Sequence, residues 1–228
     1  MPPETSPGSS PPSSPARARL DIISDVVCPW CYIGKHRLEQ ALALLDDEVD
    51  LDIRWRPFEL NPDMPREGMD RRAYCEAKFG SVEYANQLYA NVAANARADG
   101  LPMAVERIAR TPNTRAAHRL IELAGRSGCQ DAVVDALFEA YFVAGRDVGD
   151  NATLVEIGAA AGLNRDAVET ALLGASGDEA IARQEREAHA LGVSGVPAFV
   201  FNGHLLFSGA QTPQTIALAL RRAVTRGL

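Results

Sequence analysis

Residues 20–45 read LDIISDVVCPWCYIGKHRLEQALALL, and this stretch decides the fold. The run from Leu20 to Val27 is apolar enough to form a buried strand, and beyond Lys35 apolar residues recur at helical spacing. Between them lies Cys28-Pro29-Trp30-Cys31, which puts the first cysteine at the N-terminus of the predicted helix. Free backbone N–H groups and the helix dipole favour a thiolate at that position. The pattern therefore predicts a redox-active pair of cysteines.

The composition is that of a globular protein. The chain has 228 residues, of which 46% are hydrophobic, and its formal net charge is −7. No window holds the roughly 18 consecutive apolar residues of a transmembrane helix. An acidic balance without a lysine- and arginine-rich block argues against a nucleic-acid surface. We therefore expect neither a membrane nor nucleic acid among the partners, and the sequence carries no signal for a particular oligomeric state.

Residues 1–18 are predicted to form a disordered tail. The segment Met1–Pro15 is rich in proline and serine, and Glu4 is its single charged side chain. It lacks both the basic start and the apolar centre of a secretory signal peptide. We therefore expect the protein to be cytoplasmic.

The four cysteines, at positions 28, 31, 75 and 129, do not suit a disulfide framework in a chain of this length. A structural zinc site needs about four ligands, and Cys75, Cys129 and the four histidines offer no second close pair. We therefore expect no metal site. Cys75 and Cys129 are interpreted as small buried or idle thiols.

Strand character returns in two further places. Residues 49–58 alternate apolar and charged side chains, which predicts a strand that Pro57 ends. Residues 198–207 predict a hairpin around Asn202-Gly203, a dipeptide that favours two-residue turns. A closing helix is predicted from the helical spacing of Ile216, Leu220 and Val224.

The long middle of the chain has a helical pattern. Between residues 70 and 191, glycines and a proline divide the apolar periodicity into six or seven predicted helices. The order is therefore β-α-β, a helical block, then β-β-α, which is an α/β fold with one small sheet interrupted by an all-helical insertion. We divide the chain into the tail 1–18, a sheet domain made of 19–66 and 192–228, and a helical insertion domain over 67–191.

Five stretches, spread over about residues 20 to 225, resemble the DsbA-like branch of the thioredoxin superfamily. The resemblance is greatest to its FrnE group, which also includes the 2-hydroxychromene-2-carboxylate isomerases and the kappa-class glutathione transferases. The stretches are SDVVCPWCYIG (24–34), FELNP (58–62), PNT with AHR (112–114 and 117–119), LFEAYF (137–142) and GVPAFVF (195–201).

This resemblance implies a thioredoxin fold with an inserted helical domain and a cis bond before Pro197, opposite the cysteines. Proline tolerates a cis bond at small cost, and the Val196 backbone would then be free to pair with a bound peptide or glutathione. In the glutathione-using relatives, asparagines of this region bind substrate, so Asn61 and Asn113 become candidate substrate-binding residues. Phe58 is a candidate for lining the same cleft. Turn formation by the asparagines and core packing by Phe58 are the alternative interpretations.

The two cysteines have distinct expected roles. Cys28 attacks a disulfide to form a mixed disulfide, and the less exposed Cys31, one turn into the helix, resolves it. The alternative, a pair of structural cysteines, fits the strand-to-helix context poorly. Pro29 and Trp30 are expected to tune the redox potential and cover the sulfur, and they are candidate substrate-binding residues. Ordinary surface packing would explain Trp30 equally well.

Three polar residues are candidates for proton transfer. Asp25, three residues before Cys28, is a candidate proton relay, although a carboxylate at a strand end or helix entry is the commoner interpretation. His36, one turn beyond Cys31, is interpreted as a surface histidine. His118 is interpreted as a packing residue at the interface between the two domains.

Three functions are open at this point. The first is a thiol–disulfide oxidoreductase whose redox-active disulfide joins Cys28 and Cys31, with protein or small-molecule thiols and disulfides as partners and no tightly bound cofactor. The second is a glutathione-dependent isomerase or transferase acting on a small aromatic substrate. The isomerases that the chain resembles typically carry serine in place of Cys28, so two cysteines favour redox chemistry, with glutathione as a candidate substrate. The third is a polypeptide-binding, chaperone-like module with vestigial cysteines.

Overall fold

The computed structural model describes residues 17–45, 49–174 and 177–228. The predicted tail, 1–18, therefore lies outside the described residues except at its last two positions. Among the described helices, none combines the length and the apolar character that crossing a bilayer requires.

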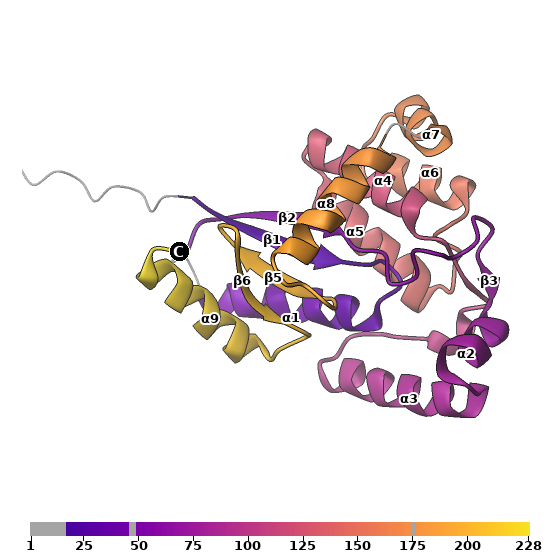
Figure 1. The fold of residues 1–228 in the computed structure, drawn as a ribbon, viewed down its shortest axis with the longest axis horizontal. Coiled ribbons are helices and arrows are strands. Elements are labelled where there is room, and N and C mark those ends of the chain that lie inside the picture. Colours follow the sequence, from indigo (N-terminus) through magenta and orange to yellow (C-terminus); the bar gives the residue numbers. More distant parts are fainter. Residues whose placement is uncertain (1–16, 46–48, 175–176) are drawn as a thin grey trace, which may run out of the picture.

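A mixed four-stranded sheet lies at the centre of the molecule, in the strand order β2-β1-β5-β6 (Figure 1). β1 (Ala18–Ser24) pairs in parallel with β2 (Leu51–Pro57), and α1 (Pro29–Leu45) connects the two. On its other side β1 pairs antiparallel with β5 (Ala198–Phe201), which forms a hairpin with β6 (His204–Ser208). The predicted β-α-β and β-β-α units are both present, and the α/β fold class is confirmed.

Alternation along β1 and β5 gives the sheet two apolar faces. Leu20 and Ile22 of β1, with Phe199 and Phe201 of β5, belong to the same core cluster as buried residues of α1 and of α9 (Pro213–Arg226). The intervening Ile23 packs instead with Ala188 of α8 (Asp178–Ala190). Because successive strand residues point to opposite faces, α1 and α9 cover one face and α8 covers the other (Figure 1). In α9, Ile216 and Leu220 are buried as predicted, but Val224 is exposed.

Two local features of the sheet follow directly from sequence. Asn202 and Gly203 have φ of 46° and 82°, which is the backbone that a two-residue hairpin turn needs and that asparagine and glycine adopt most readily. The first strand is shorter than predicted. It stops at Ser24, and residues 25–27 instead form the turn into α1, in which the Cys28 N–H donates to the Asp25 carbonyl at 3.0 Å.

The edge strand β2 is covered by a side chain that imitates a neighbouring strand. The Gln130 amide accepts the Trp55 backbone N–H at 2.9 Å and donates to the Trp55 carbonyl at 3.0 Å. An unpaired strand edge invites aggregation, and here one glutamine satisfies both backbone groups at its centre. The Trp55 ring N–H also donates to Asp131 at 3.0 Å. The neighbouring residues Gln130 and Asp131 therefore hold both the backbone and the side chain of Trp55.

The segment between β2 and α8 is mostly helical, as predicted, but not wholly so. β3 (Met69–Asp70) and β4 (Arg110–Thr111) form a two-residue antiparallel pair, which corrects the prediction of an all-helical insertion. Two residues are too few to show a period-two pattern, so no sequence signal predicts these strands. The remaining helical elements are α2 (Arg71–Phe79), α3 (Val82–Ala98), the 3₁₀ turn Val105–Arg107, α4 (Arg115–Ser127), α5 (Gln130–Phe138), the π-helical turn Glu139–Val143, α6 (Asn151–Ala160) and α7 (Arg165–Leu173).

The main hydrophobic core runs without a break from the sheet into these helices. Leu38 of α1, Trp55 of β2, Phe138 of α5 and Leu154 of α6 belong to one buried cluster. Side-chain oxygens at several helix starts cap the first backbone N–H groups, including that of Asp150, which accepts the Thr153 N–H at 2.9 Å. The division into a sheet domain and an insertion domain at residues 66/67 and 191/192 stays a prediction.

Candidate active site

Cys28 occupies the N-terminal cap of α1. Its carbonyl accepts the backbone N–H groups of Cys31 and Tyr32, at 3.0 and 3.3 Å, and the helix begins at the next residue, Pro29. Proline suits the first helical position, because its fixed φ matches the helix and no N–H is needed there. The sequence Cys-Pro-Trp-Cys therefore places the first sulfur at the positive end of a seventeen-residue helix and the second sulfur one turn behind it.

Both thiols are free and buried. Cys28 is 4% exposed and Cys31 is 0% exposed, while Trp30 between them is 37% exposed. The Cys28 Sγ lies 3.6 Å from the carbonyl oxygen of Val196, and the Val196–Pro197 peptide bond is cis. The loop before β5 therefore places a backbone acceptor directly beside the first sulfur.

The Cys31 thiol is held protonated. Burial raises its pKa well above the ordinary value, and the adjacent Cys28 thiol raises it further. The Ser24 hydroxyl and the Asp25 backbone N–H act in the opposite direction but do not compensate. A reaction that uses Cys31 as a nucleophile consequently needs a nearby group to accept its proton.

Asp25, three residues before Cys28, forms a buried pair with His118. The Asp25 carboxylate is fully buried, and its Oδ2 accepts the Leu60 N–H at 2.8 Å. Its Oδ1 lies 3.5 Å from the Nε2 of His118, which is 3% exposed and comes from α4. Neither of these two facing atoms has a hydrogen-bond partner among the described residues. Buried polar atoms are rarely left in this state, so the pair is a candidate for proton transfer.

Asp25 and His118 are far apart in the sequence, and no local pattern connects them. Asp25 was a candidate through its closeness to Cys28, whereas His118 was interpreted as a packing residue. The only sequence signal for the pairing was that both belong to stretches that carry the family resemblance.

Asn61 and Asn113 both have partners within the protein. The Asn61 Oδ1 accepts the Tyr74 hydroxyl at 3.2 Å and the Lys78 ammonium at 3.1 Å. The Asn113 amide donates to the Met64 carbonyl at 2.8 Å and accepts the Arg115 N–H at 3.0 Å, which ties the loop after β2 to the start of α4. These contacts fit a structural role, and substrate binding by either asparagine stays a prediction.

Phe58 and His36 are also held by local contacts. Phe58 is 9% exposed and packs with Ile23 and Ala188, and its ring centroid lies 5.3 Å from that of His189. The His36 Nε2 lies 3.0 Å from the Asp99 carbonyl, so this histidine is half-buried rather than free on the surface. Cys75 is buried and Cys129 is half-buried, and both are free thiols.

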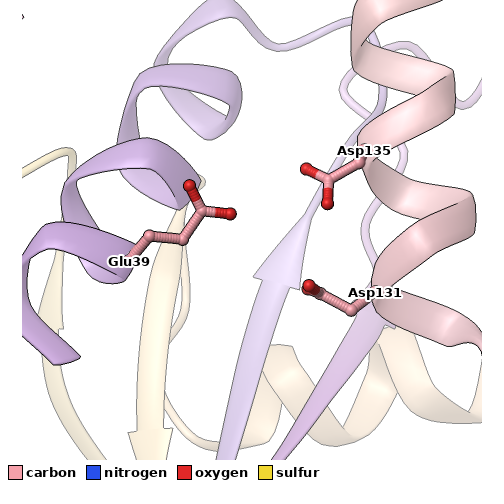
Figure 2. Close-up of side chains that lie close together, drawn as sticks. All are labelled: Glu39, Asp131 and Asp135. Carbon is pink, nitrogen blue, oxygen red and sulfur yellow. The ribbon is translucent and has the colours of Figure 1, made fainter. Parts of the chain in front are cut away.

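Three carboxylates converge between α1 and α5, from Glu39, Asp131 and Asp135 (Figure 2). One oxygen of each lies within 4.8 Å of the others, a spacing that would suit a metal ion. The Lys35 ammonium already lies among them, 2.6 Å from Asp135 and 3.5 Å from Asp131, and it also pairs with Glu39. Burial lowers the pKa of Lys35, but the hydrogen bonds to Asp135 and Glu39 outweigh burial and raise it. The Lys35 ammonium therefore occupies the position that a metal ion would take.

Comparison with known families identifies the architecture around these residues. The model of the DsbA-like thioredoxin domain matches residues 19–221. A curated relative, the uncharacterized protein YwbO of Bacillus subtilis, is 40% identical over 43 residues, which cover 19% of this chain and 20% of that protein's length.

Three solved structures share the fold over nearly the whole chain. A probable DsbA oxidoreductase from Streptomyces coelicolor is 35% identical, covers 91% of this chain and 90% of its own, and has a TM-score of 0.84. A 2-hydroxychromene-2-carboxylate isomerase is 19% identical with a TM-score of 0.68 over 92% of this chain and 97% of its own. The cytosolic disulfide reductase DsbM from Pseudomonas aeruginosa, solved with GSH, is 20% identical with a TM-score of 0.62 over 92% of this chain and 98% of its own.

Proposed function

The chain belongs to the family of DsbA-like thioredoxin domains, and from that premise we propose that it is a thiol–disulfide oxidoreductase whose redox pair is Cys28 and Cys31. One observation carries the proposal. Cys28 immediately precedes the first residue of α1, its sulfur lies beside the Val196 carbonyl, and a second free thiol, Cys31, lies one turn into the helix. A helix N-terminus stabilises the thiolate that disulfide exchange requires.

The reaction proceeds in two exchanges. The Cys28 thiolate attacks one sulfur of a substrate disulfide, an S–S bond forms between Cys28 and that half, and the other half leaves as a thiolate that takes a proton from water. Cys31 then loses its proton and attacks the Cys28 sulfur, which releases the second half and closes the Cys28–Cys31 disulfide. Two electrons pass from the dithiol to the substrate, and the reverse sequence oxidises a dithiol.

Asp25 is the group that accepts the Cys31 proton, with His118 beside it. This assignment is supported by the raised pKa of the Cys31 thiol and by the two unpartnered atoms of the Asp25–His118 pair. Both members of the pair are buried, so a proton held between them is shielded from water until the reverse reaction returns it. The Val196 backbone and the exposed face of Trp30 flank Cys28 and serve as the docking surface for the substrate.

The test is to equilibrate the protein in graded thiol–disulfide buffers, block free thiols and count them by mass. We expect a reversible two-electron transition confined to Cys28 and Cys31, unchanged in Cys75→Ser and Cys129→Ser. Cys31→Ser should accumulate a mixed disulfide at Cys28. A protein that shows only a stable glutathione adduct on Cys28, with no reversible transition, would contradict the proposal.

The second candidate is a glutathione-dependent isomerase or transferase, which the fold shared with a 2-hydroxychromene-2-carboxylate isomerase favours. In such an enzyme the thiol of glutathione does the chemistry, and the Cys28 thiol is dispensable. An isomerase or transferase rate that survives or rises in Cys28→Ser would select this candidate. We place either activity in the cytoplasm, with small-molecule or protein thiols as partners, and the cytosolic DsbM is consistent with that placement.

A further inference from the structure

Arg71, the first residue of α2, has its guanidinium in an aromatic cage. The guanidinium carbon lies 4.4 Å from the ring centroid of Tyr89 and 5.6 Å from that of Tyr74. One of its terminal N–H groups donates to the Thr111 hydroxyl at 3.0 Å. The Tyr89 side chain also hydrogen-bonds to Arg71. Rings and hydroxyls thus orient this side chain, and within the described part of the chain they leave some of its five guanidinium donors without a partner.

The charge of Arg71 has no carboxylate to balance it in the part of the chain that the structure describes. The neighbouring Arg72 is different, because it is exposed and pairs with Glu76 at 3.2 Å. Burial lowers the pKa of Arg71, yet the phenols of Tyr141 and Tyr89 and the Cys75 thiol outweigh burial and raise it. Arg71 is half-buried, and a half-buried cation without an anionic partner is a place where an anion from outside gains a strong contact.

Two chains of contacts lead from the cage toward the elements that carry the redox pair. On α3, Val92 packs against Ile33 of α1, and Tyr89 lies one helical turn before Val92. The pKa of Tyr89 is raised chiefly by burial, and it also responds to the charges of Arg71 and Cys28. From the other side, the Tyr74 hydroxyl donates to Asn61, the residue after Leu60, whose N–H holds Asp25.

We propose that Arg71, held between Tyr74 and Tyr89, binds a carboxylate of a small thiol or disulfide that reacts at Cys28. The inference rests on the proposed function and names its substrate class: carboxylate-bearing low-molecular-weight thiols, of which glutathione is the available probe. The protein as a whole carries a net charge of −7, so an anionic substrate needs such a local cation to approach.

Two disulfide substrates of different charge distinguish carboxylate binding by Arg71 from a purely structural role of this residue. Glutathione disulfide carries carboxylates and bis(2-hydroxyethyl) disulfide does not. The experiment compares how fast each oxidises the reduced wild type, Arg71→Gln and the control Arg72→Gln. A lost charge-assisted hydrogen bond is expected to lower kcat/KM for glutathione disulfide by about 10- to 100-fold in Arg71→Gln. The uncharged disulfide should react equally fast with all three proteins, and Arg71→Lys should recover part of the loss.

If kcat/KM of Arg71→Gln falls equally with both disulfides, or falls with neither, the proposal is overturned.

A binding measurement tests the carboxylate site separately, in case the protein proves not to exchange disulfides. S-methylglutathione retains the carboxylates but has no free thiol to exchange, and its binding can be followed by calorimetry. We expect the Kd of S-methylglutathione to be at least about 10-fold lower for wild type and for Arg72→Gln than for Arg71→Gln. That difference supports the carboxylate site whether or not the protein is redox-active. Equal binding to the three proteins overturns it.

Discussion

Lys35 and Asp25 are both buried charged residues near the first turns of α1, but their surroundings are opposite. Lys35 faces three carboxylates that are each more than half-exposed, so its charge is more than balanced and its partners remain hydrated. Asp25 faces a single histidine across 3.5 Å, and one oxygen and one nitrogen of that pair have no hydrogen-bond partner in the described chain. The first arrangement stabilises the contact between α1 and α5, whereas the second leaves an acceptor and a ring nitrogen able to take up or share a proton.

The largest effect is expected at Cys28, the proposed nucleophile. Cys28→Ser removes the only nucleophile that can start the exchange, so turnover with any disulfide substrate should fall about a thousandfold or more. Folding should be unchanged, because serine fits the same N-terminal cap. Reductase assays with stability measured in parallel would check this. If Cys28→Ser retained its turnover, Cys28 would not be the nucleophile, and the comparison with Lys35 would no longer concern a redox site.

The next largest effect is expected for the Asp25–His118 pair. Asp25→Asn and His118→Gln should slow the attack of Cys31 on the mixed disulfide by about 100-fold, the usual contribution of a positioned proton acceptor, and leave the first attack by Cys28 unchanged. Rapid mixing with a chromogenic disulfide separates the two steps. Lys35→Met is the control, since it alters a buried charge near the same helix without touching the pair. If all three variants slow the second step alike, the difference between the two regions is not functional.

Lys35→Met should instead cost stability. Removing a buried cation from three carboxylates is expected to lower the free energy of unfolding by about 2 kcal/mol, less than for a fully buried pair because the carboxylates keep contact with water. Urea unfolding measures the loss, and redox turnover below the transition should match wild type. The double variant Lys35→Met with Asp135→Asn should recover part of the stability. A loss of turnover without a loss of stability would contradict the structural role of Lys35.

The smallest effect lies at Tyr32, at the rim of the same acidic group. Burial, and then the charges of Glu139 and Asp135, raise the pKa of this phenol to about 12, and its hydroxyl donates to the Pro102 carbonyl at 3.2 Å. Because the folded pKa exceeds the unfolded value of about 10, this contribution is fully present below pH 10 and is lost as the pH rises from about 10 to 12. Tyr32→Phe should weaken that alkaline loss of stability and remove a component near pH 12 from the tyrosinate absorbance titration. An unchanged titration curve would show that Tyr32 does not titrate in that window.

Features of the fold that depend on neighbours in sequence could be predicted. The cap at Cys28, the helix start at Pro29 and the turn at Asn202-Gly203 each follow from the conformational preferences of one or two residues. The end of β1 was misplaced by three residues, because Val26 and Val27 are apolar in a turn that is also buried or half-buried. The β3–β4 pair was missed, because its strands are too short for any periodicity.

The sequence by itself therefore determined the order of strands and helices, the two cysteines at the start of α1 and the hairpin near the C-terminus, because each depends on local backbone preferences and on the period of apolar residues. Only the tertiary structure decided which polar groups meet. It set His118 against Asp25, closed three carboxylates around Lys35, used Gln130 to cover β2 and left Arg71 between two tyrosines. These contacts join elements far apart in the chain, and helix packing on the sheet, rather than any local pattern, fixes which side chains face one another.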